Sequence, residues 1–219
     1  MPTVRKGVSI LSLPSALIVA GGIAPYYASS GYMDAVEIFK SDTSQWYRAD
    51  PLPKACCHKS LVAIGNMCYA LGGYTDGTFF NEALYASVDD LLGNAVPANQ
   101  TTHSGSSDTQ SAWKTLPNTP RYRPAAAVLA GNLLAVGGQE TSEFMTSPSK
   151  SEVCMYSSFS NSWIHVSDLP APRSGPLVAV LSPTEILAIG GWIGAEIEDW
   201  FRPDFGSVNT VYKGTLCLK

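Results

Sequence analysis

The sequence predicts an all-β fold of four repeated units, and three observations support this prediction. A short apolar run that ends in Gly-Gly occurs four times, with the first glycine at positions 21, 72, 137 and 190. A second apolar run follows each doublet and ends in an aromatic residue. Only 15% of the 219 residues are charged, against roughly 25% in typical soluble domains, so long polar helices are not expected.

Each unit is expected to contain hairpin-forming strands, because its apolar runs are separated by glycine, asparagine or proline. The first strands are expected at residues 8–11, 61–64, 125–129 and 177–181. The second strands, which end in Gly-Gly, are expected at residues 17–22, 68–73, 133–138 and 186–191. The third strands are expected at residues 36–39, 83–85, 153–156 and 210–212.

A tryptophan followed by a Leu-Pro pair marks a fourth strand in the first three units. Trp46 and Trp163 each stand seven residues after the aromatic residue of the third strand. In unit two Trp113 stands 28 residues after Tyr85, so this unit carries an insertion at residues 88–112. Residues 99–111 are rich in serine, threonine and glutamine, and this composition predicts a mobile loop. We expect the three tryptophans to occupy equivalent, largely buried positions between units.

A repeated four-stranded sheet of about 50 residues is the blade of a β-propeller. Such sheets bury their faces by stacking against one another. We assign residues 1–219 to a single domain with repeats at 1–50, 51–117, 118–167 and 168–219. The glycine doublets suit strand ends where the backbone turns sharply or is approached closely. These structural glycines are Gly21, Gly22, Gly72, Gly73, Gly137, Gly138, Gly190 and Gly191.

The fourth unit is expected to be incomplete, because only seven residues follow Tyr212 and none is a tryptophan. The chain is therefore expected either to be part of a larger propeller or to close with four blades. An unpaired strand at the edge of the last blade would favour pairing with another chain, including a second copy.

The Gly-Gly doublet, the following aromatic residue and the spaced tryptophan together resemble the kelch repeat. Tyr156 and Trp163 are similar to its aromatic–tryptophan pair, and the resemblance covers nearly the whole chain. It implies a partner-binding propeller, of the kind found in substrate receptors of ubiquitin ligases and in cytoskeletal adaptors. A ligase role would require a BTB or F-box region outside these 219 residues.

Other function classes find little support in the sequence. His58, His103 and His165 share no metal-binding spacing, and no nucleophile elbow, phosphate loop or dinucleotide fingerprint occurs. The acidic clusters at residues 89–90 and 196–199 lie in connecting segments, where solvated charge is expected. We therefore predict a protein that is not an enzyme and that uses no metal or other cofactor.

Charge, hydropathy and cysteine content restrict the classes of partner and the cellular location to be expected. The net charge of −4 gives no electrostatic reason to expect nucleic acid or an anionic membrane as a partner. No apolar stretch reaches the roughly 18 residues of a membrane span. The five cysteines are odd in number and are interpreted as reduced thiols, which favours the cytoplasm.

The candidate binding residues lie in loops at one end of the predicted propeller. Arg121 and Arg173 each stand seven residues before an equivalent valine of a first strand. They are predicted either to bind a partner or to act as structural clamps on loop carbonyls. Aromatic side chains of the loops after the Gly-Gly doublets fit a binding rim. The candidate partner-binding aromatic residues are Tyr26, Tyr74, Phe79, Trp192 and Trp200.

Protein–protein recognition by this loop-rich end is the function that the sequence favours. The alternative is a carbohydrate-acting enzyme or a lectin, which would also use aromatic side chains at the end of a propeller. Carboxylates and arginines that converge on one pocket would favour the alternative. A broad aromatic rim without such a cluster would favour an adaptor.

Overall fold

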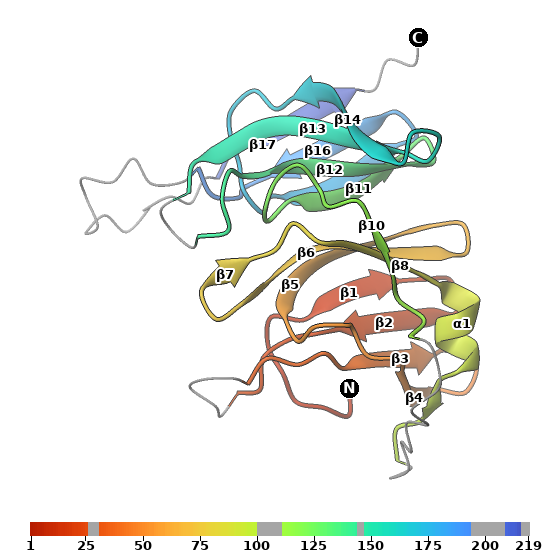
Figure 1. Cartoon of the computed structure of the whole chain (residues 1–219). Coiled ribbons are helices and arrows are strands. Elements are labelled where there is room, and N and C mark those ends of the chain that lie inside the picture. Colours follow the sequence, from red (N-terminus) through yellow and green to blue (C-terminus); the bar gives the residue numbers. More distant parts are fainter. Residues whose placement is uncertain (26–30, 100–110, 144–146, 194–208, 216–219) are drawn as a thin grey trace.

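The computed structural model describes residues 1–25, 31–99, 111–143, 147–193 and 209–215. In this part of the chain the fold is almost entirely β, with four antiparallel sheets and one short helix. The sheets follow one another along the sequence and stack as blades, from blade 1 near the N-terminus to blade 4 near the C-terminus (Figure 1). The predicted all-β kelch-type propeller fold with four blades is confirmed.

Blades 1 and 2 each contain the four predicted strands in sequential order. Blade 1 consists of β1 (Ser9–Ser12), β2 (Ala16–Ala20), β3 (Val36–Lys40) and β4 (Gln45–Ala49), with β9 (Val96–Pro97) added at its outer edge. Blade 2 consists of β5 (Cys57–Ile64), β6 (Met67–Thr75), β8 (Ala83–Ser87) and β10 (Lys114–Leu116), and the short β7 (Thr78–Phe79) folds back on β6.

Blade 3 repeats the four-stranded order, whereas blade 4 has three described strands. Blade 3 consists of β11 (Ala125–Leu129), β12 (Asn132–Gln139), β13 (Ser149–Ser157) and β14 (Ser162–Asp168). Blade 4 consists of β15 (Leu177–Ser182), β16 (Glu185–Ile189) and β17 (Val211–Thr215). Among the described residues, none pairs with the outer edge of β17.

The first strand of each blade lies on the inner edge of the stack. β1 contacts β5, β5 contacts β11, and β11 contacts β15, so these strands run side by side through all four blades (Figure 1). The segments that precede them, here called lead-in segments, pair with the backbone just beyond each second strand. The lead-in segments and the loops after the Gly-Gly doublets therefore meet at the same end of the propeller.

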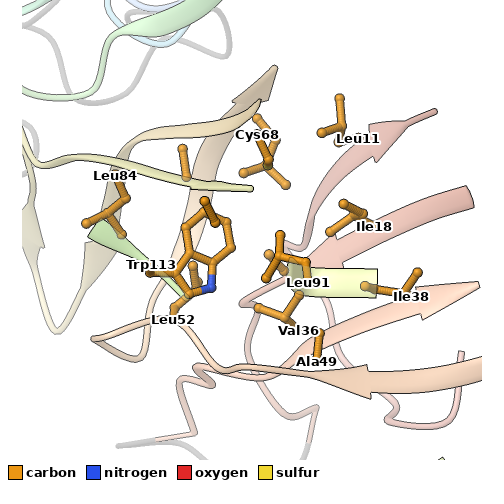
Figure 2. Close-up of a cluster of buried hydrophobic side chains, with 14 of the residues drawn as sticks. Leu11, Ile18, Val36, Ile38, Ala49, Leu52, Cys68, Leu84, Leu91 and Trp113 are labelled. Atoms are coloured by element: carbon orange, nitrogen blue, oxygen red, sulfur yellow. The ribbon is translucent and has the colours of Figure 1, made fainter. Parts of the chain in front are cut away.

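The largest hydrophobic cluster fills the junction between blades 1 and 2 (Figure 2). Trp113 lies in it with 5% of its surface exposed, and its indole N–H donates to the Asp50 carbonyl of blade 1 at 3.2 Å. Trp163 makes the same kind of contact one junction further on, where its indole N–H donates to the Pro117 carbonyl of blade 2 at 2.8 Å. Each of these tryptophans thus joins its own blade to the preceding one.

The tryptophans are equivalent in register, but their burial differs from the prediction. Trp46 pairs with Phe39, and Trp163 pairs with Tyr156. Trp113 precedes the Lys114–Tyr85 pair and so lies level with Ala86, which pairs with Cys68 four residues before its doublet, as Phe39 pairs with Leu17. Only Trp113 is buried, whereas Trp46 and Trp163 are half-buried. Trp46 belongs to the first blade, and no described blade covers the face on which it lies.

The glycine doublets allow successive blades to approach closely. Gly21 has φ +64°, and a Cβ there would overlap the Cys56 carbonyl oxygen of the next lead-in segment. Gly137 has φ +62° and the same relation to the Arg173 carbonyl. The second glycine of these two doublets donates its N–H to that same carbonyl, from Gly22 at 2.8 Å and from Gly138 at 2.7 Å. A side chain at the first glycine would separate the blades.

The insertion of blade 2 is more ordered than its composition predicted. Its first residues form helix α1 (Val88–Gly93), and Leu91 of this helix is fully buried against Trp113 and blade 1 (Figure 2). Strand β9 then pairs with β4. Apolar side chains anchor residues 88–97, whereas the predicted mobile loop, residues 99–111, contains none. Residues 100–110 lie outside the described residues.

Candidate functional site

In each blade, the residue that follows the one paired with the end of the second strand adopts a left-handed backbone conformation. The four equivalent positions are Gly7 (φ 65°), His58 (φ 56°), Arg123 (φ 51°) and Gly175 (φ 55°). Glycine adopts this conformation freely, whereas residues with a Cβ are uncommon there. Blades 2 and 3 thus carry side chains at a strained position that blades 1 and 4 fill with glycine. Both side chains, imidazole and guanidinium, are cations or can become cations.

Each of these two side chains lies over the glycine of a neighbouring blade. The Arg123 guanidinium passes over Gly175, where a Cβ would lie 2.8 Å from its Nε, and its Nη1 donates to Ser174 Oγ at 3.3 Å. The His58 ring covers Gly7, where a Cβ would lie 3.3 Å from its Cε1. The glycines therefore make the room in which the two basic side chains lie.

Arg123 is at the centre of an array of aromatic rings from several blades. Its guanidinium lies 4.8 Å from the ring centroid of Phe79 in blade 2 and 5.9 Å from that of Trp192 in blade 4. Phe79 is tilted against Tyr74 at 4.9 Å, and Tyr74 meets Tyr32 of blade 1 edge to face at 6.0 Å. Such cation–π and aromatic contacts are each favourable by about 0.5–1.5 kcal/mol.

We call this set the mouth: Tyr32, His58, Tyr74, Phe79, Arg123 and Trp192. It draws residues from all four blades and lies where the lead-in segments meet the loops after the second strands. Phe79 is buried beneath the others at 3% exposure, while Tyr32, Tyr74, Arg123 and Trp192 are half-buried and His58 is exposed. Five of these six side chains are thus at least partly exposed, and Phe79 is the buried member of the set.

The mouth is a partly desolvated site that carries the positive charge of Arg123. Burial lowers the pKa of Arg123, and burial together with the nearby Arg123 charge lowers the pKa of His58. Among the described residues no acidic side chain forms an ion pair with Arg123. A cation that is partly desolvated without a counter-charge favours binding of an anion, since a carboxylate would form charge-assisted hydrogen bonds with it.

A backbone hairpin holds the Phe79 side of the mouth in place. β7 continues from the Tyr74 end of β6, and the Phe79 N–H donates to the Ser142 carbonyl of blade 3 at 2.8 Å. Thr78 also forms a bridge with Glu143 in the same loop of blade 3. The aromatic support is thus fixed by two blades, which leaves little conformational entropy to lose on binding.

The two arginines predicted from the sequence have a different geometry from Arg123. Arg173 is 1% exposed, and its guanidinium donates to the Gly190 carbonyl at 3.1 Å and to Thr210 Oγ1. Arg121 donates to Glu152, and this hydrogen bond raises the pKa of Arg121 and lowers that of Glu152. These contacts favour the clamp alternative for both residues.

The clamp recurs in every blade. Arg5, which the sequence analysis missed, is the equivalent residue of blade 1 and donates to the Ala35 carbonyl at 2.9 Å and to buried Glu37 at 3.0 Å. In blade 2 Lys59 takes this role and donates to the Gly72 carbonyl at 2.6 Å and to Glu82 at 2.9 Å. In blades 1, 2 and 4 the cation ties the end of the second strand to the start of the third. In blade 3 Arg121 holds Glu152 of the third strand.

Three of the five predicted aromatic residues come together at the mouth, namely Tyr74, Phe79 and Trp192. Tyr26 and Trp200 lie outside the described residues. Sequence reasoning missed Arg123 and assigned no binding role to His58. An alignment of the four lead-in segments would have found them, because each occupies the position at which the other two units have glycine.

A polar pocket of about 390 Å³ lies beside the mouth, between blades 2 and 3. Lys54, Phe80, Glu82 and Tyr122 contribute to its lining, and Lys54 Nζ lies 3.9 Å from the centroid of the Phe80 ring. Glu82 is the one carboxylate among the lining residues, and Lys59 holds it in an ion pair. Glycoside hydrolysis requires two carboxyl groups across the scissile bond, so these lining residues do not assemble that chemistry.

The described part of the chain contains neither a candidate metal site nor an exposed cysteine thiol. No group of three or more His, Cys, Asp and Glu side chains there could hold a metal ion. Cys56, Cys57, Cys68 and Cys154 are buried free thiols, and burial raises the pKa of Cys57 and of Cys68 to about 12. Cys217 lies outside the described residues. The helix of the described chain, α1, is too short to span a membrane.

Four stacked antiparallel blades with their first strands on the inner edge define a β-propeller. The chain is 27% identical over 169 residues to Kelch-like protein terF of Aspergillus terreus, covering 72% of this chain and 32% of that protein. It is 26% identical over 173 residues to Kelch-like protein 23 of Homo sapiens, covering 75% and 27%. Kelch-like protein 41b of Danio rerio is 27% identical over 169 residues, covering 76% and 24%.

The repeat pattern, the blades and the similarity to three Kelch-like proteins support the kelch-repeat family for this chain. No model of a known protein family matches the sequence. The chain spans between about a quarter and a third of the length of these three relatives. The resemblance predicted from the Gly-Gly doublets and spaced tryptophans is confirmed.

Proposed function

We propose that this chain is a non-catalytic protein-interaction module whose partner binds at the mouth. The observation that carries the proposal is the pair of basic residues, His58 and Arg123, held in left-handed backbone conformations over an aromatic support. Such a conformation costs about 1–3 kcal/mol for a residue with a Cβ, and strain of this kind clusters at functional sites. Blades 1 and 4 avoid the strain with glycine, so the fold itself does not require these side chains.

The chemistry of the mouth defines the kind of partner that fits. The Arg123 guanidinium offers charge-assisted hydrogen bonds to a carboxylate, and the rings of Tyr74 and Trp192 offer apolar surface beside it. Arginine, tyrosine and tryptophan are the residues that most often dominate protein interfaces. The partner segment is therefore proposed to present an acidic side chain next to an apolar or aromatic one.

A carbohydrate-acting enzyme is the less favoured alternative. The described residues of the mouth contain no carboxylate, and the adjoining pocket contributes only Glu82, which is already paired with Lys59. An aromatic rim with a central cation fits recognition better than hydrolysis. The cytoplasm remains the proposed location, because the four described cysteines are free thiols.

The test is affinity capture with the wild-type chain and two matched variants. Arg123→Gly removes the guanidinium at a position where glycine is the natural residue of two blades, so folding should be unimpaired. Phe159→Ala alters a fully exposed side chain in the β13–β14 turn, at the other end of blade 3. Proteins captured by wild type and by Phe159→Ala should be depleted at least tenfold with Arg123→Gly.

The captured protein is then tested directly by calorimetry with a purified segment that contains an acidic residue, and with the same segment after that residue is replaced by alanine. Loss of binding on either replacement supports the mouth. Unchanged capture by Arg123→Gly, with a melting temperature equal to wild type, would refute the proposal. Binding to a glycan array that Arg123→Gly abolishes would establish the lectin alternative instead.

A further inference from the structure

The clamp of blade 4 differs from the other three clamps in the group that faces its cation. In blades 1 to 3 the clamp cation forms an ion pair with a carboxylate, which belongs to Glu37, Glu82 and Glu152 respectively. Arg173, the clamp cation of blade 4, donates instead to the neutral hydroxyl group of Thr210. In the described part of the chain no acidic side chain forms an ion pair with Arg173.

Arg173 is deeply buried although it has no counter-charge. It is 1% exposed, and its guanidinium lies 4.4 Å from the centroid of the Tyr212 ring. Its Nη1 donates to the Gly190 carbonyl at 3.1 Å, while its Nε has no hydrogen-bond partner among the described residues. Burial of a charge is costly unless the charge is paired and its donors are satisfied. This guanidinium therefore has both the charge and a donor with which to bind an anion.

The register of the blades shows that Thr210 occupies the position of a carboxylate. In each blade one residue of the third strand pairs with the last residue before the Gly-Gly doublet. The residue directly before it is Glu82 in blade 2, Glu152 in blade 3 and Thr210 in blade 4. Blade 1 has Ala35 there, and its clamp uses Glu37, two residues further on. An anion at position 210 would thus give blade 4 the clamp that the other blades have.

Thr210 is accessible although its hydroxyl oxygen contacts a buried guanidinium. It lies directly before β17 and is exposed. Its carbonyl accepts from the Gly190 N–H at 3.0 Å, as the Glu82 carbonyl accepts from the Gly72 N–H at 2.8 Å in blade 2. The backbone thus holds the Thr210 hydroxyl group at the guanidinium, while the side chain can be reached by an enzyme from solvent.

We propose that Thr210 is a phosphorylation site, and that its phosphate group supplies the anion that completes the clamp of blade 4. A protein kinase transfers the γ-phosphoryl group of ATP to Thr210 Oγ1. The new O–P bond forms as the bond from the γ-phosphorus to its bridging oxygen breaks, ADP leaves, and the hydroxyl proton passes to a base of the kinase. The phosphate oxygens then accept charge-assisted hydrogen bonds from the Arg173 guanidinium. Because Thr210 is exposed, the rest of the phosphate group stays hydrated.

A stronger clamp would stabilise the junction between blades 3 and 4. The Arg173 carbonyl accepts from the Gly138 N–H of blade 3 at 2.7 Å. The next residue, Ser174, pairs through its backbone with Trp192, at 2.7 and 2.9 Å. Arg173 therefore holds the lead-in segment of blade 4 against blade 3. This consequence concerns stability, and it does not depend on what the mouth binds.

The test compares three forms of the full chain: unmodified, phosphorylated at Thr210, and phosphorylated at Thr43, with phosphothreonine incorporated during synthesis. Thr43 is a matched control, since it is exposed and its hydroxyl group accepts from Tyr47 and not from an arginine. Phosphorylation at Thr210 should raise the melting temperature by about 2–4 °C. Phosphorylation at Thr43, which adds the same charge without a guanidinium partner, should not raise it.

Two variants and a titration make the test specific to the clamp. In Arg173→Gln the cation is removed, so phosphorylation at Thr210 should no longer raise the melting temperature. Thr210→Glu introduces the carboxylate of blades 2 and 3 and should reproduce part of the rise. If Arg173→Gln does not fold, phosphorus NMR titration of the wild-type chain decides. Arg173 should hold the second pKa of the Thr210 phosphate below its usual value of about 6 and below that of the Thr43 phosphate.

Mass spectrometry of the chain, isolated from its native cells with phosphatase inhibitors, should find phosphate on Thr210. An absence of phosphate on this residue would overturn the proposal, because it would show that no kinase uses the site. A rise in melting temperature that persists in Arg173→Gln would overturn it as well, since the clamp would not be the group that binds the phosphate. Equal melting temperatures of the unmodified and Thr210-phosphorylated chains, or equal second pKa values of the two phosphates, would lead to the same conclusion.

Discussion

The junction between blades 1 and 2 and the junction between blades 3 and 4 are built from the same repeat, but only the first is filled. In the first, Trp113, Leu52 and the buried Leu91 of α1 form one continuous core. In the second, equivalent positions surround an open cavity, and Tyr212 is half-buried at its rim. The fourth strand and its tryptophan account for much of the difference, and the helix of the insertion adds to it. Stability in this propeller is therefore unevenly distributed, with the well-packed end near the N-terminus.

The largest effect is expected at the filled junction. Trp113→Ala should lower the free energy of unfolding by about 3–5 kcal/mol, because it removes a buried indole and leaves a cavity. Trp46→Ala, at the equivalent register position but half-buried on the open face of blade 1, should cost about 1 kcal/mol. Urea unfolding of both variants measures the difference. Equal costs for the two variants would contradict the difference in burial between Trp113 and Trp46.

A smaller effect is expected from one substitution made at two equivalent positions. Val36 and Val211 each begin a third strand opposite the residue that precedes a Gly-Gly doublet, but their exposed fractions are 2% and 52%. Val36→Thr should cost about 1–3 kcal/mol, because it buries a hydroxyl group that has no hydrogen-bond partner among its apolar neighbours. Val211→Thr should change stability by less than about 0.5 kcal/mol. Thermal unfolding of the pair provides a direct comparison, and a large cost at Val211 would show that blade 4 is covered in solution.

The smallest effect concerns the clamps of blades 3 and 4. Arg121 pairs with the carboxylate of Glu152, whereas its counterpart Arg173 donates to the neutral Thr210. The Arg121 hydrogen bond lowers the pKa of Glu152 in the folded state, so its contribution is present above the unfolded pKa of about 4.3 and is lost as pH falls through the lower folded value.

Glu152→Gln should therefore cost less than about 1 kcal/mol at neutral pH, and the difference from wild type should shrink below about pH 4. The matched variant Thr210→Val should show a cost that does not vary over the same range. Denaturant unfolding from neutral to acid pH measures both. A cost for Glu152→Gln that is constant with pH would show that the clamp contributes through packing alone.

The site was predictable in part, and the reason lies in the kind of pattern involved. Tyr74, Phe79 and Trp192 follow Gly-Gly doublets and are aromatic, so the repeat alone places them at one end of the fold. Arg121 and Arg173 were found because they recur at a constant distance from a strand, but recurrence in a repeat also marks structural roles, and the clamp is one. Arg123 and His58 are exceptions within the repeat. Exceptions to a repeat are where a scaffold can carry function without losing its fold.

The sequence by itself determined the strand order and the four blades, because glycine doublets and alternating apolar runs act through local backbone preferences. It also determined the kelch family resemblance. Tertiary structure alone decided which tryptophan is buried, since burial depends on whether a neighbouring blade covers the face. It likewise decided that α1 packs as part of the core and that Arg123 meets rings from two other blades. Contacts between blades join residues far apart in the chain, and no local pattern specifies them.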